Sequence, residues 1–267
     1  MERLMARKIL AVIPTFNRGD LIALTSAYLR RIPFDRASFS FLISDDCSTE
    51  YGLGFLRGAY ATLPNASFVR TSRNAGAAAH MWVLLKHFAA IACDKILILD
   101  SDLVVHERCL ACVEAFDDAP IASLYNSRLH AIESSHDGYC TKRDIGWAGA
   151  LVARDVIEEL LQQHGNKPFD DWALRDYASS RQVPIKVCTP SAIEHIGVSG
   201  ANSFGPEYFD RSFDFPREAI DQATLDFFRH TRGIDLLRYL ETGPEPMPDA
   251  DNLRVFHLPT ATEKGQP

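Results

Sequence analysis

The sequence predicts an α/β fold with a mostly parallel central sheet flanked by helices. In about the first hundred residues, short runs rich in Ile, Val, Leu and Phe alternate with helical patterns, and such connections give parallel strands covered on both faces. The composition agrees, because 46% of the 267 residues are hydrophobic and 24% are charged, which suffices for a large core. After residue 105 the pattern becomes irregular, and we expect a second half with antiparallel strands and a C-terminal helix.

Strands and helices are expected to alternate through the first half. Apolar runs predict strands, and apolar residues at helical spacing predict helices: strands at 8–14, 38–46, 66–72 and 94–102, and helices at 20–32, 51–63 and 75–92. Each strand is followed by polar and turn-forming residues, in the segments PTFNR, DDCST, SRNAG and DSD. Because ligands bind beyond the carboxyl ends of parallel strands, these segments should form one rim around a binding site.

The second half is expected to be less regular. We predict helices at 106–116, 155–164 and 170–182, and strands at 121–127, 144–154 and 184–197. Residues 198–215 are rich in glycine and serine with interleaved aromatic residues, which is typical of a mobile loop. The proline-rich end, 241–267, should be only partly ordered.

Charge and hydropathy exclude some classes of function. The net charge is -7 and the pI is 5.7, whereas nucleic acid is bound mainly through Lys and Arg, so we expect no nucleic-acid partner. A ligand that carries phosphate would need a metal ion or a few well-placed basic groups. We expect no transmembrane segment, because Lys86, His87, Asp94 and Lys95 interrupt the longest apolar stretch. Peripheral contact with a membrane stays open.

The six cysteines are expected to be reduced. Cys109 and Cys112 form a C-x-x-C motif on a predicted helix, where their sulfur atoms share one face. No second cysteine or histidine pair stands at ligand spacing, so we expect small buried thiols rather than a zinc site. The apolar run near the N-terminus is too short for a leader peptide and should be the first strand. These features favour a cytoplasmic protein.

Two aspartates follow the apolar run KILIL. Side chains of a strand alternate between its faces, so Asp100 and Asp102 should point the same way and Ser101 the other. Like charges this close repel by a few kcal/mol at intermediate dielectric. The pair is stable with a bound cation, with one acid protonated, or with water around both acids, as at an ordinary solvated strand end.

Seven segments occur in an order that resembles a known family: VIPTFNR, ISDDCST, RNAG, LDSD, GWAGALVARDVIEEL, DDWALR and PSAIEHIG. Over residues 8–200 the set resembles the inverting family 2 of nucleotide-sugar-dependent glycosyltransferases, which have the Rossmann-like GT-A fold. The resemblance implies one domain over 1–240. It would comprise a nucleotide-binding half at 8–105 and an acceptor half at 106–240, with a lid at 198–215.

The resemblance also implies roles for individual residues. It assigns nucleotide-sugar binding to Pro14, Thr15, Asn17, Arg18, Asp45, Asp46, Arg73, Asn74, Asp100, Ser101 and Trp147. Asp45 or Asp46 would accept a hydrogen bond from the pyrimidine N3–H, which uracil has and cytosine lacks. For these two aspartates, a turn at the strand end is the alternative. Arg18 or Arg73 would contact the diphosphate.

Asp102 and His195 are the implied metal ligands. A divalent ion would bridge Asp102 to the diphosphate and stabilise the leaving group as a Lewis acid, while Asp100 reaches the ribose or a metal-bound water. A lone histidine is usually structural, but His195 stands where the family has its last ligand. An imidazole among oxygen ligands favours Mn²⁺ over Mg²⁺, although Mg²⁺ is compatible with the set.

Asp170 and Asp171 are the candidate catalytic residues. The resemblance places the general base at Asp171, while either acid could instead cap the helix that follows. The start of a helix should keep the pKa of Asp171 low and the carboxylate ionised. Trp147 and Trp172 would offer apolar faces to a sugar, or else pack in the core.

The sequence therefore predicts an inverting, metal-dependent glycosyltransferase. It would transfer a sugar from a nucleoside diphosphate, UDP in the first instance, to a hydroxyl of a carbohydrate or glycoconjugate in polysaccharide or glycoconjugate synthesis. A sugar-nucleotide pyrophosphorylase is one alternative, but PTFNRGD lacks the glycine-rich phosphate loop of that class. A non-catalytic nucleotide-sugar or glycan-binding module is another, and the presence of both DSD and DDW argues against it.

Overall fold

The computed structural model describes residues 8–165, 167–198 and 210–242. The strands are β1 (Ile9–Thr15), β2 (Phe39–Asp45), β3 (Ala66–Arg70), β4 (Lys95–Ile98), β5 (Leu103–Val105), β6 (Ile121–Ser123), β7 (Ile132–His136), β8 (Tyr139–Lys142), β9 (Ala150–Ala153), β10 (Ile185–Cys188) and β11 (Ile193–His195). The α-helices are α1 (Gly19–Leu29), α2 (Leu53–Ala59), α3 (Ala77–Ala90), α4 (Cys109–Ala115), α5 (Arg154–His164), α6 (Trp172–Arg181), α7 (Gln222–Phe227) and α8 (Leu236–Thr242).

Nine of these strands form one sheet, in the order β3-β2-β1-β4-β9-β6-β10-β8-β7. The four strands of the first half are parallel, and β9 joins them antiparallel to β4. In the second half β6 and β10 are parallel, and the other pairs are antiparallel. Strands β5 and β11 form a separate antiparallel pair. The predicted α/β fold, with its parallel first half and irregular second half, is confirmed.

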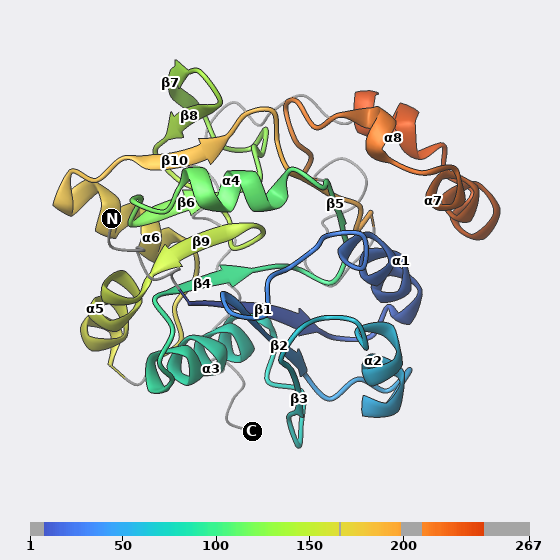
Figure 1. Cartoon of the computed structure of the whole chain (residues 1–267), viewed down its shortest axis with the longest axis horizontal. Helices are drawn as coiled ribbons and strands as arrows, with labels where there is room; N and C mark the ends of the chain where they lie inside the picture. The colour runs from blue at the N-terminus through green and yellow to red at the C-terminus, as the bar shows by residue number, and fades with distance from the viewer. Residues whose placement is uncertain (1–7, 166, 199–209, 243–267) are drawn as a thin grey trace, which may run out of the picture.

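Strand β1 lies between two layers of helices, one on each face of the sheet. Its side chains alternate, so Ile9, Ala11 and Ile13 join the core that includes α1 and α2. Leu10 and Val12 join the core that includes α3 and α5. Figure 1 shows the first pair of helices on one side of these strands and the second pair on the other. Both faces are therefore covered, as the apolar character of the parallel strands requires.

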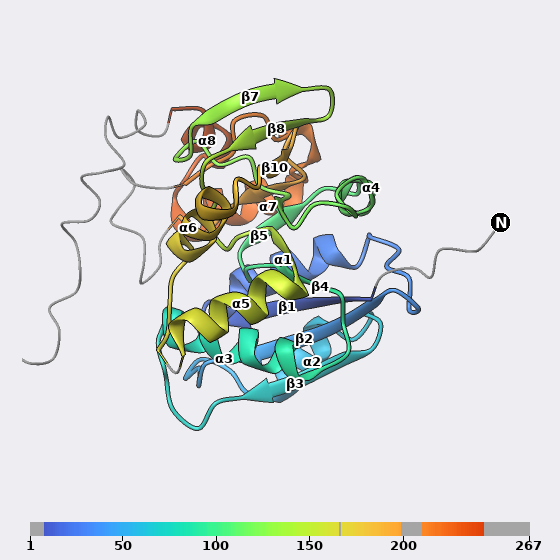
Figure 2. The ribbon, with the colours of Figure 1, turned by 90° about the vertical axis from the view of Figure 1, so that its left-hand side faces the viewer.

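Two long predicted strands of the second half are only partly formed. The run at 184–197 forms two strands in different sheets, β10 and β11, with a turn at Thr189–Pro190 between them. In the run at 144–154, β9 accounts for the last residues and a loop for the first. The sequence does not predict the hairpin of β7 and β8, because β7 is exposed along its whole length and lacks apolar alternation. Figure 2 shows this hairpin at the edge of the molecule.

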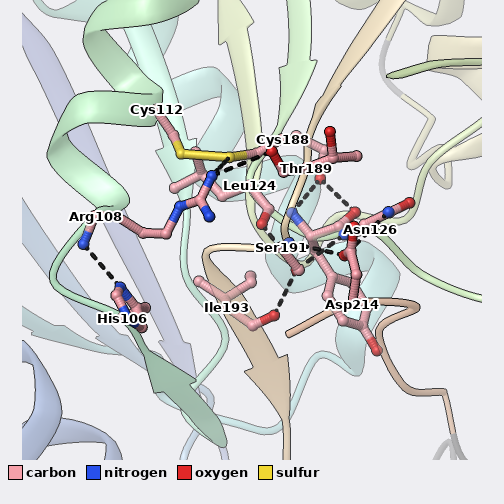
Figure 3. Close-up of a disulfide and its surroundings, with 12 residues drawn as sticks. His106, Arg108, Cys112, Leu124, Asn126, Cys188, Thr189, Ser191, Ile193 and Asp214 are labelled. Carbon is pink, nitrogen blue, oxygen red and sulfur yellow. Dashed lines mark hydrogen bonds between the residues drawn. A yellow bond between two sulfur atoms is a disulfide. The ribbon is translucent and has the colours of Figure 1, made fainter. Parts of the chain in front are cut away.

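The expectation of free thiols is wrong for two cysteines. Cys112 of α4 and Cys188 of β10 form a disulfide across 76 residues of sequence (Figure 3). The partner of Cys112 comes from a distant strand, which a C-x-x-C spacing cannot reveal. Cys109 is a buried thiol, as expected. Disulfides are typical of oxidising compartments, so the cysteines do not support a cytoplasmic location.

The C-terminal helices pack against α1. The backbone N–H of Asp221, just before α7, donates to the hydroxyl of Tyr28 at 2.9 Å. The same hydroxyl pairs with Thr224 Oγ1 at 2.9 Å. Leu236 and Leu240 of α8 join the core on this side of the sheet. The predicted C-terminal helix is therefore confirmed.

The predicted lid and tail lie mostly outside the described residues. This applies to 199–209 and to 243–267. Residues 210–215, the end of the expected lid, are packed against the protein, because the backbone N–H of Ser212 donates to the buried carboxylate of Glu194 in β11 at 2.9 Å. Among the helices of the described chain, none has the length and apolar character needed to span a membrane.

Candidate active site

The two aspartates of the DSD segment lie in a turn beyond the central sheet. Strand β4 ends at Ile98, and Asp100 and Asp102 stand in the connection to β5. The argument from strand alternation is therefore wrong in detail, because the strand ends before the first acid. The turn nevertheless brings the acids together. With His195, they offer one ligand atom each within 4.8 Å of one another.

His195 reaches this turn through the small sheet. In the pairing of β11 with β5, His195 lies opposite Leu103, the neighbour of Asp102 in the chain. The backbone N–H of Ile196 donates to the Asp102 carbonyl at 2.9 Å. His195 Nε2 lies 3.3 Å from Asp102 Oδ1. Backbone pairing thus holds the end of β11 against the acidic turn.

Gly197 allows the chain to pass directly beside Asp102. A Cβ atom at this position would lie 2.1 Å from Asp102 Oδ2 and 2.8 Å from His195 Cε1. Both distances are too short for real contacts, so a larger residue would displace the carboxylate or the imidazole. The glycine is therefore part of the geometry of the cluster.

Arg18 forms an ion pair with Asp102. Its Nη1 atom lies 2.7 Å from Asp102 Oδ2, where 31% of the arginine side chain and 3% of the aspartate side chain are exposed. Asn17 and Arg18 both have left-handed backbone, with φ of 53° and 58°, which makes a sharp turn after β1. The sequence assigns Arg18 to the diphosphate, and the structure places it on the carboxylate of an implied metal ligand.

Burial and neighbouring charges shift the pKa values of the cluster. Burial and the charge of Asp102 raise the pKa of Asp100. Burial also raises the pKa of Asp102, but His195 and Arg18 outweigh burial and hold this pKa below its usual range. Burial lowers the pKa of His195, and the adjacent Asp102 more than reverses this effect. Asp102 is therefore the more acidic of the two carboxyl groups.

The cluster has the donor set of a divalent cation site. Two carboxylates and one imidazole suit Mn²⁺ and accept Mg²⁺. Asp102 Oδ1 is buried and accepts no hydrogen bond within the described part of the chain, apart from its ion-pair contact with His195. A buried carboxylate oxygen in this situation is suited to a metal ion. The residues thus fit the ion that the family resemblance implies.

Asp45 and Asp46 both hold loops of the rim. The Asp45 carboxylate accepts from the backbone N–H of Ser48 at 3.2 Å, which is a turn contact at the end of β2. The Asp46 carboxylate accepts from the N–H groups of Ala75 and Gly76 at 2.8 and 2.9 Å. Both aspartates are buried. A nucleobase would therefore share either carboxylate with the loops that it fixes.

The other residues assigned to the nucleotide sugar surround the same strand ends. Asn17 Oδ1 accepts from the backbone N–H of Thr49 at 2.9 Å, which joins the loops after β1 and β2. Thr15 and Ser101 are buried, and Pro14 is partly exposed. Arg73 and Asn74 are exposed. The loops after β1, β2 and β3 are thus joined by hydrogen bonds beyond the ends of these strands.

Asp170 and Asp171 have different surroundings. Asp170 Oδ1 accepts from the backbone N–H of Trp172 at 3.2 Å, at the start of α6. The side chain of Asp171 makes no such bond. Burial and the charge of Asp170 raise the pKa of Asp171 to about 6. The expectation of a low pKa is therefore wrong, because loss of solvent outweighs the effect of the helix start.

A pocket with a volume of about 200 Å³ opens beside Asp171. Trp172 lines this pocket with Gly146, and the guanidinium of Arg175 lies 4.2 Å from the centre of the Trp172 ring. Trp147 does not line the pocket; it is partly buried and packs against the core, with its ring 6.4 Å from that of Phe169. The aromatic side chain at the pocket is thus Trp172 and not Trp147.

The sequence analysis missed three polar residues of this pocket. His130 Nδ1 lies 2.8 Å from Asp144 Oδ1, and both residues line the pocket. Asp210 lines it as well, and its carboxylate accepts from Ser127 Oγ at 2.7 Å. These residues stand outside any motif of fixed spacing, so the sequence contains no signal that singles them out.

The sequence of the chain matches a family model over residues 10–173, and the model is that of glycosyl transferase family 2. The matched range covers more than half of the chain. The chain belongs to glycosyl transferase family 2. Asp102 and Asp171 lie inside the range. His195 lies beyond it and reaches Asp102 through the pairing of β11 with β5.

Solved structures share the fold of this family 2 chain. S. aureus TarS 1-349 in complex with UDP-GlcNAc has a TM-score of 0.52 and 18% identity, over 75% of this chain and 62% of that one. The same TarS fragment without a named ligand has a TM-score of 0.51 and 17% identity, over 70% and 59%. Mannosyltransferase PcManGT from Pyrobaculum calidifontis, in complex with GDP-Man and Mn²⁺, has a TM-score of 0.49 and 16% identity, over 74% and 59%.

These comparisons set the limits of the likeness. The family 2 chain spans between 59% and 62% of the length of these solved chains. A search of curated proteins found no match. At identities of 17% and 18%, the likeness to TarS shows the GT-A type of fold alone.

Proposed function

We propose that this family 2 chain is an inverting, metal-dependent glycosyltransferase. It transfers a sugar from a nucleoside diphosphate sugar, with UDP as the expected nucleotide, to a hydroxyl of a carbohydrate or glycoconjugate. The observation that carries the proposal is the cluster of Asp100, Asp102 and His195 at the carboxyl end of the parallel strands, where folds of this class bind their ligands.

The cluster serves the departing diphosphate. A divalent ion, Mn²⁺ in preference to Mg²⁺, supplies Lewis-acid stabilisation of the leaving group when it is bound. Asp102 and His195 would hold this ion, and Asp100 would complete the ligand set or accept from the ribose. Gly197 has no side chain, so the Asp102 carboxylate can occupy the space beside it.

Asp171 is the general base in this proposal. Its carboxylate lines the pocket, and a pKa raised to about 6 leaves it ionised at neutral pH yet more basic than an exposed aspartate. It takes the proton of the acceptor hydroxyl while the hydroxyl oxygen bonds to the anomeric carbon and the bond to the diphosphate breaks. Asp170 holds the start of α6 and takes no part in the proton transfer.

The donor and the acceptor occupy different halves of the chain. Residues 8–105 bind the nucleotide, where Asp45 or Asp46 accepts from the N3–H of uracil. Residues 106–240 form the acceptor half, in which Trp172 and the pair of His130 and Asp144 offer an apolar face and hydrogen-bonding groups to a sugar. TarS, which shares the fold, was solved with UDP-GlcNAc, so UDP sugars are the first donors to test.

Calorimetry with UDP tests the proposal directly. We expect UDP to bind in the presence of Mn²⁺ and not in the presence of a chelator. Asp102→Asn should weaken UDP binding in Mn²⁺ by more than about tenfold, because it removes a charged metal ligand. UDP binding that is unchanged by the chelator would refute the metal dependence.

A panel of nucleotide sugars, assayed for donor hydrolysis, then identifies the sugar without knowledge of the acceptor. Metal-dependent release of UDP from one sugar nucleotide supports the transferase. Binding of UDP without hydrolysis of any donor, and without exchange of a sugar phosphate, would favour the non-catalytic module. Formation of UTP and a sugar 1-phosphate from a UDP sugar and pyrophosphate would favour the pyrophosphorylase.

A further inference from the structure

Arg18 is paired with the acid that the proposed metal ion needs. The 2.7 Å contact between Arg18 Nη1 and Asp102 Oδ2 is a charge-assisted hydrogen bond between residues 84 positions apart. The left-handed turn at Asn17 and Arg18 sets the course of the chain at this point. Asp102 is almost fully buried, so water screens this pair only weakly.

The position of Arg18 permits a metal ion but opposes it electrostatically. Arg18 contacts Oδ2 of Asp102, whereas the oxygen that faces His195 is Oδ1, so the guanidinium and the ion need not share one atom. They would nevertheless stand on the two oxygens of one buried carboxylate, where like charges repel strongly. The two acids of the cluster supply two negative charges, and Arg18 and a divalent ion together supply three positive charges.

A diphosphate changes this balance. It brings at least two negative charges, which compensate the surplus of positive charge at the cluster. Arg18 is placed to help, because 31% of its side chain is exposed and its contact with Asp102 uses one of the five N–H donors of a guanidinium.

We propose that Arg18 couples metal binding to nucleotide binding. Arg18 lowers the affinity of the cluster for a divalent ion alone and raises its affinity for the same ion together with a nucleoside diphosphate. Without nucleotide, the guanidinium serves as the counter-charge of Asp102. This inference rests on the proposed function, since it takes Asp102 as the metal ligand.

Arg18→Gln tests the coupling by binding alone. Mn²⁺ affinity is measured without nucleotide from the electron paramagnetic resonance signal of free Mn²⁺, and UDP affinity is measured by calorimetry in saturating Mn²⁺. Removal of one positive charge from the cluster should tighten Mn²⁺ binding at least about tenfold and weaken UDP binding at least about tenfold. Linkage is reciprocal, so the effect of UDP on Mn²⁺ affinity and that of Mn²⁺ on UDP affinity must shrink by the same factor.

Arg232→Gln is the matched control. It removes the same charge from another arginine–aspartate pair, in which Arg232 Nη2 lies 2.5 Å from Asp20 Oδ2 at the start of α1. This control should leave both affinities unchanged. Arg18→Lys keeps the charge and loses the fork of donors, so its Mn²⁺ affinity without nucleotide should stay near that of the wild type.

Two results with Arg18→Gln would overturn the coupling. Weaker binding of Mn²⁺ alone by Arg18→Gln would show that Arg18 orients Asp102 for the metal, and unchanged affinities would show that Arg18 has no part in the site. Should Arg18→Gln fail to fold, the wild-type protein still decides, because Mn²⁺ affinity that is equal with and without UDP contradicts the proposal. A wild-type protein that binds no UDP in Mn²⁺ would refute the proposed function itself, which is a different outcome.

Discussion

Replacing Gly197 with alanine should disturb the metal cluster through a single methyl group. The added Cβ would stand 2.1 Å from Asp102 Oδ2 and 2.8 Å from His195 Cε1. Since non-bonded heavy atoms prefer separations of about 3.5 Å, at least one ligand must move by about 1 Å. Lost support around a metal ligand typically costs about 10- to 100-fold in metal affinity. We therefore expect Gly197→Ala to bind UDP in Mn²⁺ about 10- to 100-fold more weakly than the wild type.

Calorimetry of UDP binding at a fixed, subsaturating Mn²⁺ concentration measures this effect, and thermal melting checks the fold. Overpacking of this kind costs about 1–3 kcal/mol, so the melting temperature should fall while the fold is kept. Gly58→Ala is the control, because a Cβ at Gly58 meets nothing within 4 Å. If Gly197→Ala binds UDP and Mn²⁺ as tightly as the wild type, the packing of Gly197 against Asp102 does not position the metal ligands, and the reasoning is refuted.

Three further predictions concern the base and the disulfide. Asp171→Asn should keep UDP affinity and cut sugar transfer by about a hundredfold or more, whereas Asp170→Asn should keep most turnover. Steady-state assays measure the transfer rates of both variants. If Asp170→Asn is inactive and Asp171→Asn is active, Asp170 is the base and Asp171 is not. Transfer should decline as the pH falls below about 6, because burial raises the pKa of Asp171 to about 6 and protonation removes the base; a pH–rate profile without this decline contradicts the assignment. Reduction of the Cys112–Cys188 disulfide should lower the free energy of unfolding by about 2–4 kcal/mol, since it opens a loop of 76 residues. Denaturant titration with and without reductant measures this change, and Cys112→Ser should not respond to the reductant.

Local patterns in the sequence were sufficient for the first half of the fold. The strands at 8–14 and 38–46 and the helix at 75–92 lie close to where apolar spacing predicts them. Each element buries residues that are two, three or four positions apart, so a short window contains the whole signal. The rim of polar residues followed as well, because the carboxyl ends of parallel strands meet at one edge of the sheet.

The site itself was determined by contacts between distant segments. Asp100 and Asp102 meet in a turn and not along a strand, and the pairing of β5 with β11 brings His195 to them. The acidity expected of Asp171 from the helix start was wrong, because burial of its carboxylate depends on the residues packed around it. A local sequence pattern shows where a charged residue lies along an element. It does not show how far the side chain of that residue is exposed to water.

The sequence by itself therefore determined the class of fold, the order of the elements in its first half and the set of acids and basic residues at the strand ends. The tertiary structure decided which of these groups meet: Arg18 with Asp102, His130 with Asp144, and Cys112 with Cys188. The spacing of apolar residues in the sequence indicates which face of a helix or strand is buried. The pairing of polar groups depends on how whole elements pack, and that arrangement is selected by the burial of the entire core rather than by any short segment.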